Sequence, residues 1–145
     1  MAKDIFTEAD QQQIREAIQE AELNTSGEVK IHIEGKLSEN VMDRASFVFE
    51  KLELHETKLR NGVLIYLAIE SKEFAILGDV GINQKVPEGF WDSTSLIMLE
   101  HFKKGDFKGG LIAGAKEAGL QLKAHFPYQK GDINELSDDI SFGKK

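Results

Sequence analysis

An apolar run at residues 63–69 constrains the fold of this chain more than any other segment. Apolar side chains occupy both alternating registers of the run, so both faces of a strand formed from it must be covered. Strands of this kind are typical of the middle of a sheet that has helices on each side. We therefore expect 63–69 to be the central strand of an α/β domain.

Two neighbouring runs are expected to join the central strand in one sheet. Residues 29–34 alternate between apolar and polar side chains, which favours a half-polar strand near an edge of the sheet. A helical segment separates 29–34 from the central run, and connections of this kind are almost always right-handed and join parallel strands. Residues 74–77 follow the central run after a short polar connection, which predicts a β-hairpin.

Four helices are expected around this sheet. The first is predicted to be capped by Thr7, because Asp10 follows at the spacing of a capping box. Ser38 is predicted to cap the second helix and Asp106 the fourth, and Pro87 is expected at the start of the third. The third helix is expected to have a broad apolar face, formed by Phe90, Trp91, Leu96, Ile97, Leu99 and Phe102.

The fourth helix carries small residues at four-residue spacing, namely Gly110, Gly114 and Ala118. We expect this stripe to let the helix backbone approach the sheet or another helix closely. Charged residues such as Lys108 and Lys116 in the same helix exclude a membrane dimerisation motif.

Composition and charge exclude several classes of protein. A chain of 145 residues fits one domain, which we place at 1–127, followed by a polar acidic tail at 128–145. The formal net charge of -7 argues against nucleic acid as a partner, since phosphate binding requires clustered Lys and Arg. The absence of cysteine excludes disulfides and thiolate metal sites.

No segment has the pattern of a signal peptide or the length to cross a bilayer, so we expect a soluble, cytoplasmic protein without direct membrane insertion.

Three turn sequences, at 25–28, 60–62 and 78–83, form the candidate site. The first two lead into the predicted parallel strands, and the third follows the hairpin strand. Parallel strands begin at the same edge of a sheet, and an antiparallel neighbour ends there. Polar side chains from three separate loops are therefore expected to converge.

Asp79 is the first candidate for a cation ligand. It lies between glycines in the third turn, where the backbone can turn sharply and present carboxylate and carbonyl oxygens to a hard cation such as Ca²⁺. The alternative is that Asp79 only caps the turn. The segment is not an EF-hand, since Gln84 stands where that loop requires glycine and Phe90 where it requires glutamate. A cation site would therefore need ligands from several loops.

Glu28, Asn61 and Asn83 are the candidate ligands that accompany Asp79. Glu28 would supply a second carboxylate and Asn61 an amide oxygen, both of which hard cations accept. Arg60 introduces an alternative, because an ion pair between Arg60 and either Glu28 or Asp79 would occupy the oxygens that a metal needs. Asn61 could equally serve only to form the turn that starts the central strand.

Segments that are characteristic of one family occur in the expected order over nearly the whole chain, at 6–7, 25–29, 60–66, 74–76, 78–82, 90–91 and 134–136. Through them the chain resembles the TPM domain family, which includes thylakoid-lumen and photosystem II repair proteins and many bacterial proteins. The resemblance implies a three-layer α/β/α sandwich with a small mixed sheet. It also implies divalent-cation binding, often discussed as calcium, and the acid phosphatase activity ascribed to plant members.

Three classes of function follow from these observations. The favoured one is a module that binds calcium or another divalent cation through the ligands named above. The second is a metal-dependent acid phosphatase, with Asp79 as nucleophile or metal ligand and Arg60 as the hydrogen-bond donor that binds the phosphate group. The third is an interaction domain that binds an unidentified protein partner through the edge loops or the acidic tail.

Overall fold

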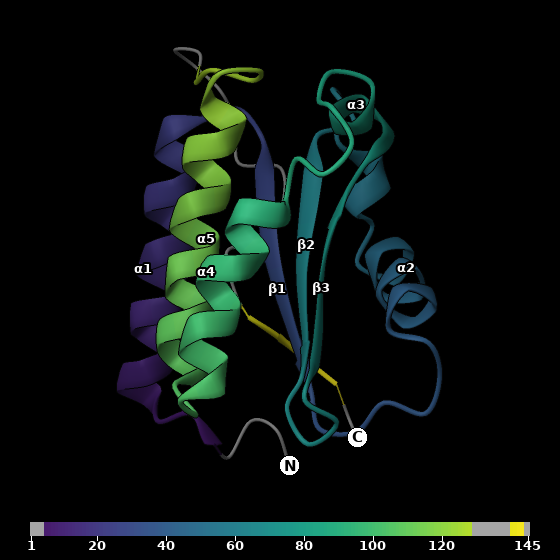
Figure 1. The fold of residues 1–145 in the computed structure, drawn as a ribbon. Coiled ribbons are helices and arrows are strands. Elements are labelled where there is room, and N and C mark those ends of the chain that lie inside the picture. The colour runs from purple at the N-terminus through teal and green to yellow at the C-terminus, as the bar shows by residue number, and fades with distance from the viewer. Residues whose placement is uncertain (1–4, 129–139, 144–145) are drawn as a thin grey trace.

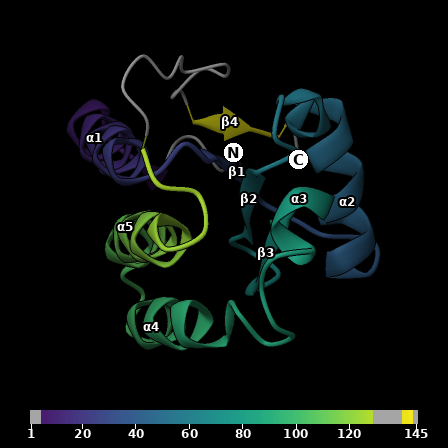
Figure 2. The same cartoon turned by 90° about the horizontal axis from the view of Figure 1, so that it is seen from above.

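The computed structural model describes residues 5–128 and 140–143. Its elements in chain order are α1 (Glu8–Asn24), β1 (Glu28–Glu34), α2 (Val41–Lys51), the 3-10 turn η2 (Leu54–Glu56), β2 (Gly62–Ala68), β3 (Glu73–Gly78), α3 (Val80–Asn83), α4 (Asp92–Lys103), α5 (Phe107–Lys123) and β4 (Ser141–Phe142). A mixed sheet with the order β3-β2-β1-β4 lies between α1, α4 and α5 on one face and α2 on the other (Figures 1 and 2). The α/β sandwich expected from the sequence is confirmed.

β2 is the central strand, as its sequence predicts. Every residue of Gly62–Ala68 is buried. β2 pairs in parallel with β1 on one side and antiparallel with β3 on the other. The predicted crossover and the predicted hairpin are therefore both present.

β1 lies next to the edge strand β4, near an edge of the sheet as expected, but its polar side is buried and not half-exposed. Glu28, His32 and Glu34 are all buried on this side. β1 is an inner strand because β4 pairs in parallel with its second half, and Ile140 and Phe142 pack against the main core. Most of the predicted acidic tail lies outside the described residues.

The predicted caps of α1 and α5 are confirmed. Thr7 accepts a hydrogen bond from the backbone N–H of Asp10, whose side chain accepts one from the N–H of Thr7 in return. Asp106 accepts a hydrogen bond from the N–H of Gly109 at the start of α5. Over the described ranges, no helix has both the length and the apolar character needed to cross a bilayer.

Two other helices begin later than predicted. α2 begins after Asn40, whose side chain accepts hydrogen bonds from the first backbone N–H groups, so the prediction of Ser38 as its cap is wrong. α4 begins well after Pro87, because Pro87 and the residues that follow it belong to the loop between α3 and α4. On α4, Leu96 is 64% exposed and Ile97 39%, so the apolar face of this helix is narrower than predicted.

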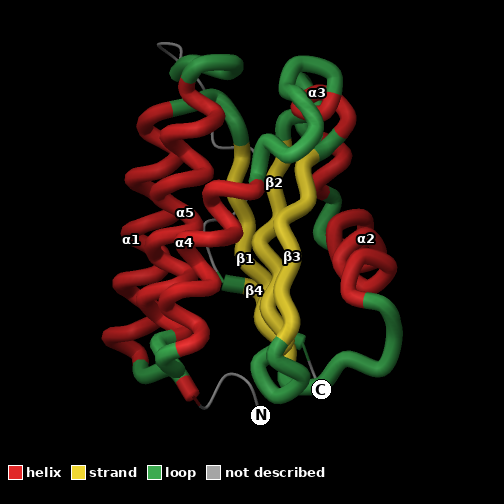
Figure 3. Tube along the Cα trace, in the orientation of Figure 1, coloured by secondary structure: helices red, strands yellow, loops and turns green. Residues whose placement is uncertain are grey.

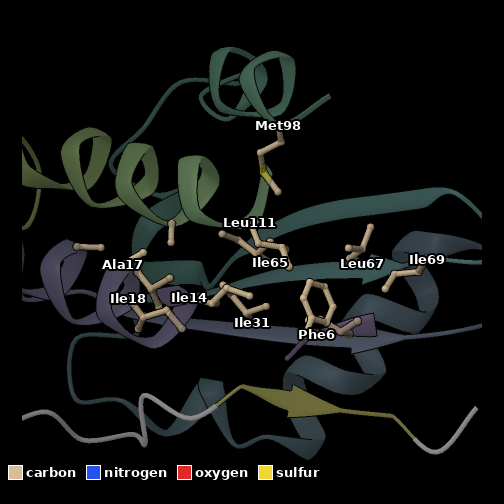
Figure 4. Close-up of a cluster of buried hydrophobic side chains, with 14 residues drawn as sticks. Phe6, Ile14, Ala17, Ile18, Ile31, Ile65, Leu67, Ile69, Met98 and Leu111 are labelled. Atoms are coloured by element: carbon tan, nitrogen blue, oxygen red, sulfur yellow. The ribbon is translucent and has the colours of Figure 1, made fainter. Parts of the chain in front are cut away.

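The main core fills the space between the sheet and the layer of three helices. Figure 4 shows Ile14 and Ile18 of α1 beside Ile31 of β1, with Ile65 of β2 and Met98 of α4 in the same cluster. These side chains explain the spacing of apolar residues along α1 and the alternation along β1. The core therefore holds the sheet in a fixed position against α1 and α5.

The small residues of α5 let two other helices pack closely against it. A Cβ added at Gly114 would lie 2.5 Å from the sulfur of Met98 in α4. A Cβ added at Gly119 would lie 2.7 Å from the Cα of Ala21 in α1. At Gly114, a member of the predicted stripe, the close approach is therefore to another helix and not to the sheet, and Gly119 adds a second such approach outside the stripe.

Candidate functional site

The first and second predicted turns meet at the edge of the sheet where α3 lies, among the loops at the top of Figure 3. The backbone N–H of Glu28 donates to the carbonyl oxygen of Asn61 at 3.3 Å, and Nδ2 of Asn61 donates to Oγ of Ser26 at 3.5 Å. A Cβ added at Gly27 would lie 3.3 Å from the same Asn61 carbonyl oxygen. The two turns are therefore in direct contact.

The third turn is joined to the second through backbone hydrogen bonds. The N–H of Asp79 donates to the carbonyl oxygen of Gly62 at 3.0 Å, and the N–H of Gly81 donates to that of Arg60 at 2.9 Å. A Cβ at Gly81 would lie 2.5 Å from the Arg60 carbonyl oxygen, so only glycine permits this approach. The convergence of all three turns at one edge is confirmed.

Arg60 forms a bidentate ion pair with Asp79. Nε of Arg60 lies 2.7 Å from Oδ2 of Asp79, and Nη2 lies 2.9 Å from Oδ1. Oδ1 also accepts the N–H of Val80 at 2.7 Å, so that Asp79 caps the α3 turn as well. The hydrogen bonds to Asp79 raise the pKa of the Arg60 guanidinium. The ion pair and the turn cap, which the sequence left open as alternatives to a metal site, are both present.

Glu28 and Asp79 flank β2 at the same level of the sheet. Glu28 is the partner of Gly62 in the β1–β2 ladder, and Asp79 bonds to the same Gly62 from the β3 side. Neighbours in one row across a sheet point to the same face, here the face covered by α2 and η2. Two strand spacings separate the two Cα atoms by roughly 10 Å. Both residues are buried, with 3% and 5% of their surface exposed.

Asn61 is buried and its side chain bonds to Ser26, whereas Asn83 is exposed. Nδ2 of Asn83 donates to the carbonyl oxygen of Gly78 at 3.3 Å. That carbonyl points away from β2, because the N–H of the same peptide unit, which belongs to Asp79, points towards β2. Asn83 therefore holds the third turn from the outer side of β3 and does not face Glu28.

No single loop at this edge supplies enough oxygen ligands for a hard cation, so a cation site would need ligands from several loops. Within the described part of the chain, no group of three or more His, Cys, Asp or Glu side chains could hold a metal ion. Glu28, Asp79, the Asn61 amide and nearby backbone carbonyls are donors of the type that Ca²⁺ accepts. In this structure Arg60 occupies both carboxylate oxygens of Asp79.

A second buried polar cluster lies at the other end of β1, where the sequence analysis expected no site. Nε of Arg44 lies 3.2 Å and 3.1 Å from the two carboxylate oxygens of Glu34, and the hydroxyl of Tyr66 donates to Oε2. Nε2 of His32 lies 3.1 Å from Oε1 of Glu34, although this contact is not aligned as a hydrogen bond. Nδ1 of His32 lies 2.8 Å from Oγ of Ser141. The sequence did contain one signal for this cluster: the two-residue spacing of His32 and Glu34 places both side chains on one face of a strand.

The charges of this cluster are fixed by its hydrogen bonds. Burial raises the pKa of Glu34, but the hydrogen bonds from Arg44 and Tyr66 outweigh burial and lower that pKa to about 2. Burial lowers the pKa of His32, so the ring is neutral at neutral pH. Burial and the neighbouring Glu34 raise the pKa of Tyr66. Glu34 of β1 is therefore ionised, and its hydrogen bonds with Arg44 and Tyr66 link β1 to α2 and β2.

A profile for the TPM domain matches residues 2–121, a stretch that includes all three turns of the sheet edge. The chain belongs to the TPM domain family. This TPM domain is similar to the BA42 protein of the psychrophilic bacterium Bizionia argentinensis, whose NMR structure has a TM-score of 0.90 and 47% sequence identity over 95% of each chain. The resemblance noted in the sequence is thus confirmed.

A more distant structural similarity concerns the fold alone. The N-terminal domain of the cg2496 protein from Corynebacterium glutamicum matches with a TM-score of 0.63 and 11% identity, over 97% of this TPM domain and 81% of the other chain. A search among curated proteins finds no match.

Proposed function

We propose that this TPM domain binds a divalent cation, calcium in the first instance, at the sheet edge where its three turns meet. The observation that carries the proposal is the placement of Glu28 and Asp79 at one level of the sheet, on either side of Gly62. An ion between these carboxylates would be bound by both of them, with the Asn61 amide, backbone carbonyls and water completing its coordination shell.

Arg60 is the internal competitor of the proposed ion. Its guanidinium provides the positive charge at Asp79, and its side chain is 46% exposed. Because nearly half of the Arg60 side chain already faces solvent, an incoming cation can compete with it for the Asp79 oxygens. Arg60 lies in a loop, and its side chain can move towards solvent while the hydrogen bonds of the sheet remain intact. Calcium binding is therefore proposed to exchange the guanidinium for the ion at the same oxygens.

Calcium titration with the melting temperature as readout tests this function. Because few carboxylates converge, we expect a Kd in the weak class of roughly 10⁻⁴ to 10⁻³ M. With a Kd of about 10⁻³ M, a tenfold excess of free calcium over the Kd raises the free energy of unfolding by about 1.4 kcal/mol. Asp79→Asn should abolish this increase because it removes a carboxylate ligand.

Arg60→Gln provides the decisive comparison. The substitution frees Asp79 from its competitor, so we expect tighter calcium binding than in the wild type, measured by the same titration and by NMR chemical shift mapping. Asp138→Ala, in the acidic stretch beyond the described residues, is the control and should leave binding unchanged. If Asp138→Ala removes binding while Arg60→Gln has no effect, the site at the sheet edge is refuted.

A further inference from the structure

β3 forms one edge of the sheet. Its inner side pairs with β2, and no strand among the described residues pairs with its outer side. Figure 2 shows β3 at the end of the sheet, with α2 and α4 on its two sides. Edge strands present unpaired backbone groups that can pair with another extended chain.

The register of the hairpin identifies the backbone groups that point outward. The N–H of Asp79 donates inward to Gly62, and in an antiparallel ladder every second residue exchanges hydrogen bonds with the partner strand. The odd-numbered positions of β3 therefore bond to β2. The N–H and C=O groups of Phe74 and Ile76 consequently point outward, and no hydrogen bond from another described residue satisfies them.

β3 also lacks the usual protection of an edge strand. Its sequence from Glu73 to Gly78 contains neither proline nor lysine, the residues with which natural edges commonly prevent pairing. Its one charged residue is at the start of the strand. The outward groups of Phe74 and Ile76 are therefore available to a partner backbone.

A groove of about 600 Å³ opens along this edge. Its apolar walls include Phe74 and Ile76 of β3, Met42 of α2, and Phe90 and Trp91 of the loop before α4. The rings of Phe90 and Trp91 pack edge to face, with centroids 4.8 Å apart. A groove beside unpaired backbone groups combines two features of peptide-binding sites, namely main-chain pairing and side-chain pockets.

The charge of the groove defines the type of peptide. Glu88 and Asp92 line it, and no Lys, Arg or His of the described residues does. The formal net charge of the whole chain is -7. Basic side chains on a partner would therefore be attracted to the groove.

We propose that the outer edge of β3 binds an extended segment of another protein as an added strand, with Lys or Arg residues of the segment facing Glu88 and Asp92. Apolar side chains of the segment would contact Phe90, Trp91 and Met42. The site is on the outer side of β3, whereas the proposed cation site lies between β3 and β1. Peptide binding and cation binding are thus independent proposals.

Trp91 supplies the signal for a direct test. It is the single tryptophan of the chain and lines the groove, so its fluorescence reports occupancy. The probe is a short, end-capped peptide of alternating lysine and valine. Ile76→Pro removes an outward N–H that β2 does not use, and we expect it to weaken peptide binding by about tenfold, the factor that corresponds to roughly one hydrogen bond.

N-methylated forms of the peptide test strand addition without changing the protein. In an added strand, alternate N–H groups face β3, so methylation of one alternate set should abolish binding and methylation of the other set should preserve it. Glu88→Lys should weaken binding, while the matched Glu16→Lys on the distant helix α1 should not. Equal effects of both methylated peptides, or of both lysine variants, would mean nonspecific charge attraction and would overturn the proposal, as would an absence of binding.

Discussion

Arg44→Met tests how much the ionised Glu34 contributes to stability. The Glu34 side chain is 1% exposed, and the Arg44 side chain that pairs with it is 21% exposed. Removing the cation from a buried ion pair typically costs about 3–5 kcal/mol, because the carboxylate remains buried without its partner. Since Arg44 is partly exposed, we expect the lower end of this range, about 3 kcal/mol near neutral pH. Methionine keeps an unbranched stem at this position and so limits the loss of packing.

The pH dependence of stability provides a second estimate of the free energy that the ionised Glu34 contributes. The pKa of Glu34 is about 2 in the folded protein, against 4.5 for an ordinary glutamate. A pKa lowered by folding stabilises the protein above the unfolded value of 4.5, and this stabilisation is lost as the pH falls from 4.5 towards 2. The difference corresponds to roughly 3 kcal/mol, at about 1.36 kcal/mol per pH unit. Arg44→Met should therefore destabilise strongly near neutral pH and only weakly once Glu34 is protonated.

Urea unfolding monitored by circular dichroism measures both effects. The free energy of unfolding would be compared between wild type and Arg44→Met near neutral pH and at the acid end of this window. Arg15→Met, on α1, is the matched control, because Arg15 bonds to the exposed Gln12 and should change stability little. A loss that is equal at both pH values, or equal to that of Arg15→Met, would refute the role assigned to the Glu34 charge.

Three further predictions concern the site and the packing. Gly81→Ala should destabilise the fold by about 1–3 kcal/mol in the same urea assay, because its Cβ would overlap the Arg60 carbonyl oxygen. Gly119→Val should lower the melting temperature, since a side chain there would overlap Ala21 of α1. Asp79→Asn should eliminate any metal-dependent hydrolysis of p-nitrophenyl phosphate while leaving the circular dichroism spectrum intact; activity that persists in this variant would belong to another site or to a contaminant.

Several elements of the fold could be predicted because their signals are local. The apolar run of β2 requires cover on both faces, and the capping box of Thr7 and Asp10 fixes the start of α1 within one helical turn. The start of α2 could not be predicted in this way, because local signals also compete there. Ser38 and Asn40 are both capping residues a short distance apart, and their local sequences do not decide which one accepts the free N–H groups.

The candidate site could be located from the sequence, but its internal contacts could not. Strand order alone places the three turns at one edge, and this depends only on the crossover and hairpin rules. Whether Arg60 pairs with Glu28 or Asp79 depends on distances of a few ångströms between loops that are far apart in the chain. The close approach at Gly81 brings Arg60 to Asp79, and no local pattern encodes it.

The sequence by itself therefore determined the strands, most of the helices and the edge at which polar turns meet, because these follow from periodicity and short-range capping. Tertiary structure decided the environment of each polar side chain. The alternation in β1 predicted that His32 and Glu34 lie on one face. Only the tertiary structure buries them, with Arg44 of α2 over that face and with Tyr66 of β2 and the strand β4 on either side of β1. Burial and pairing depend on which distant segments cover a strand, and this information is spread over the whole chain.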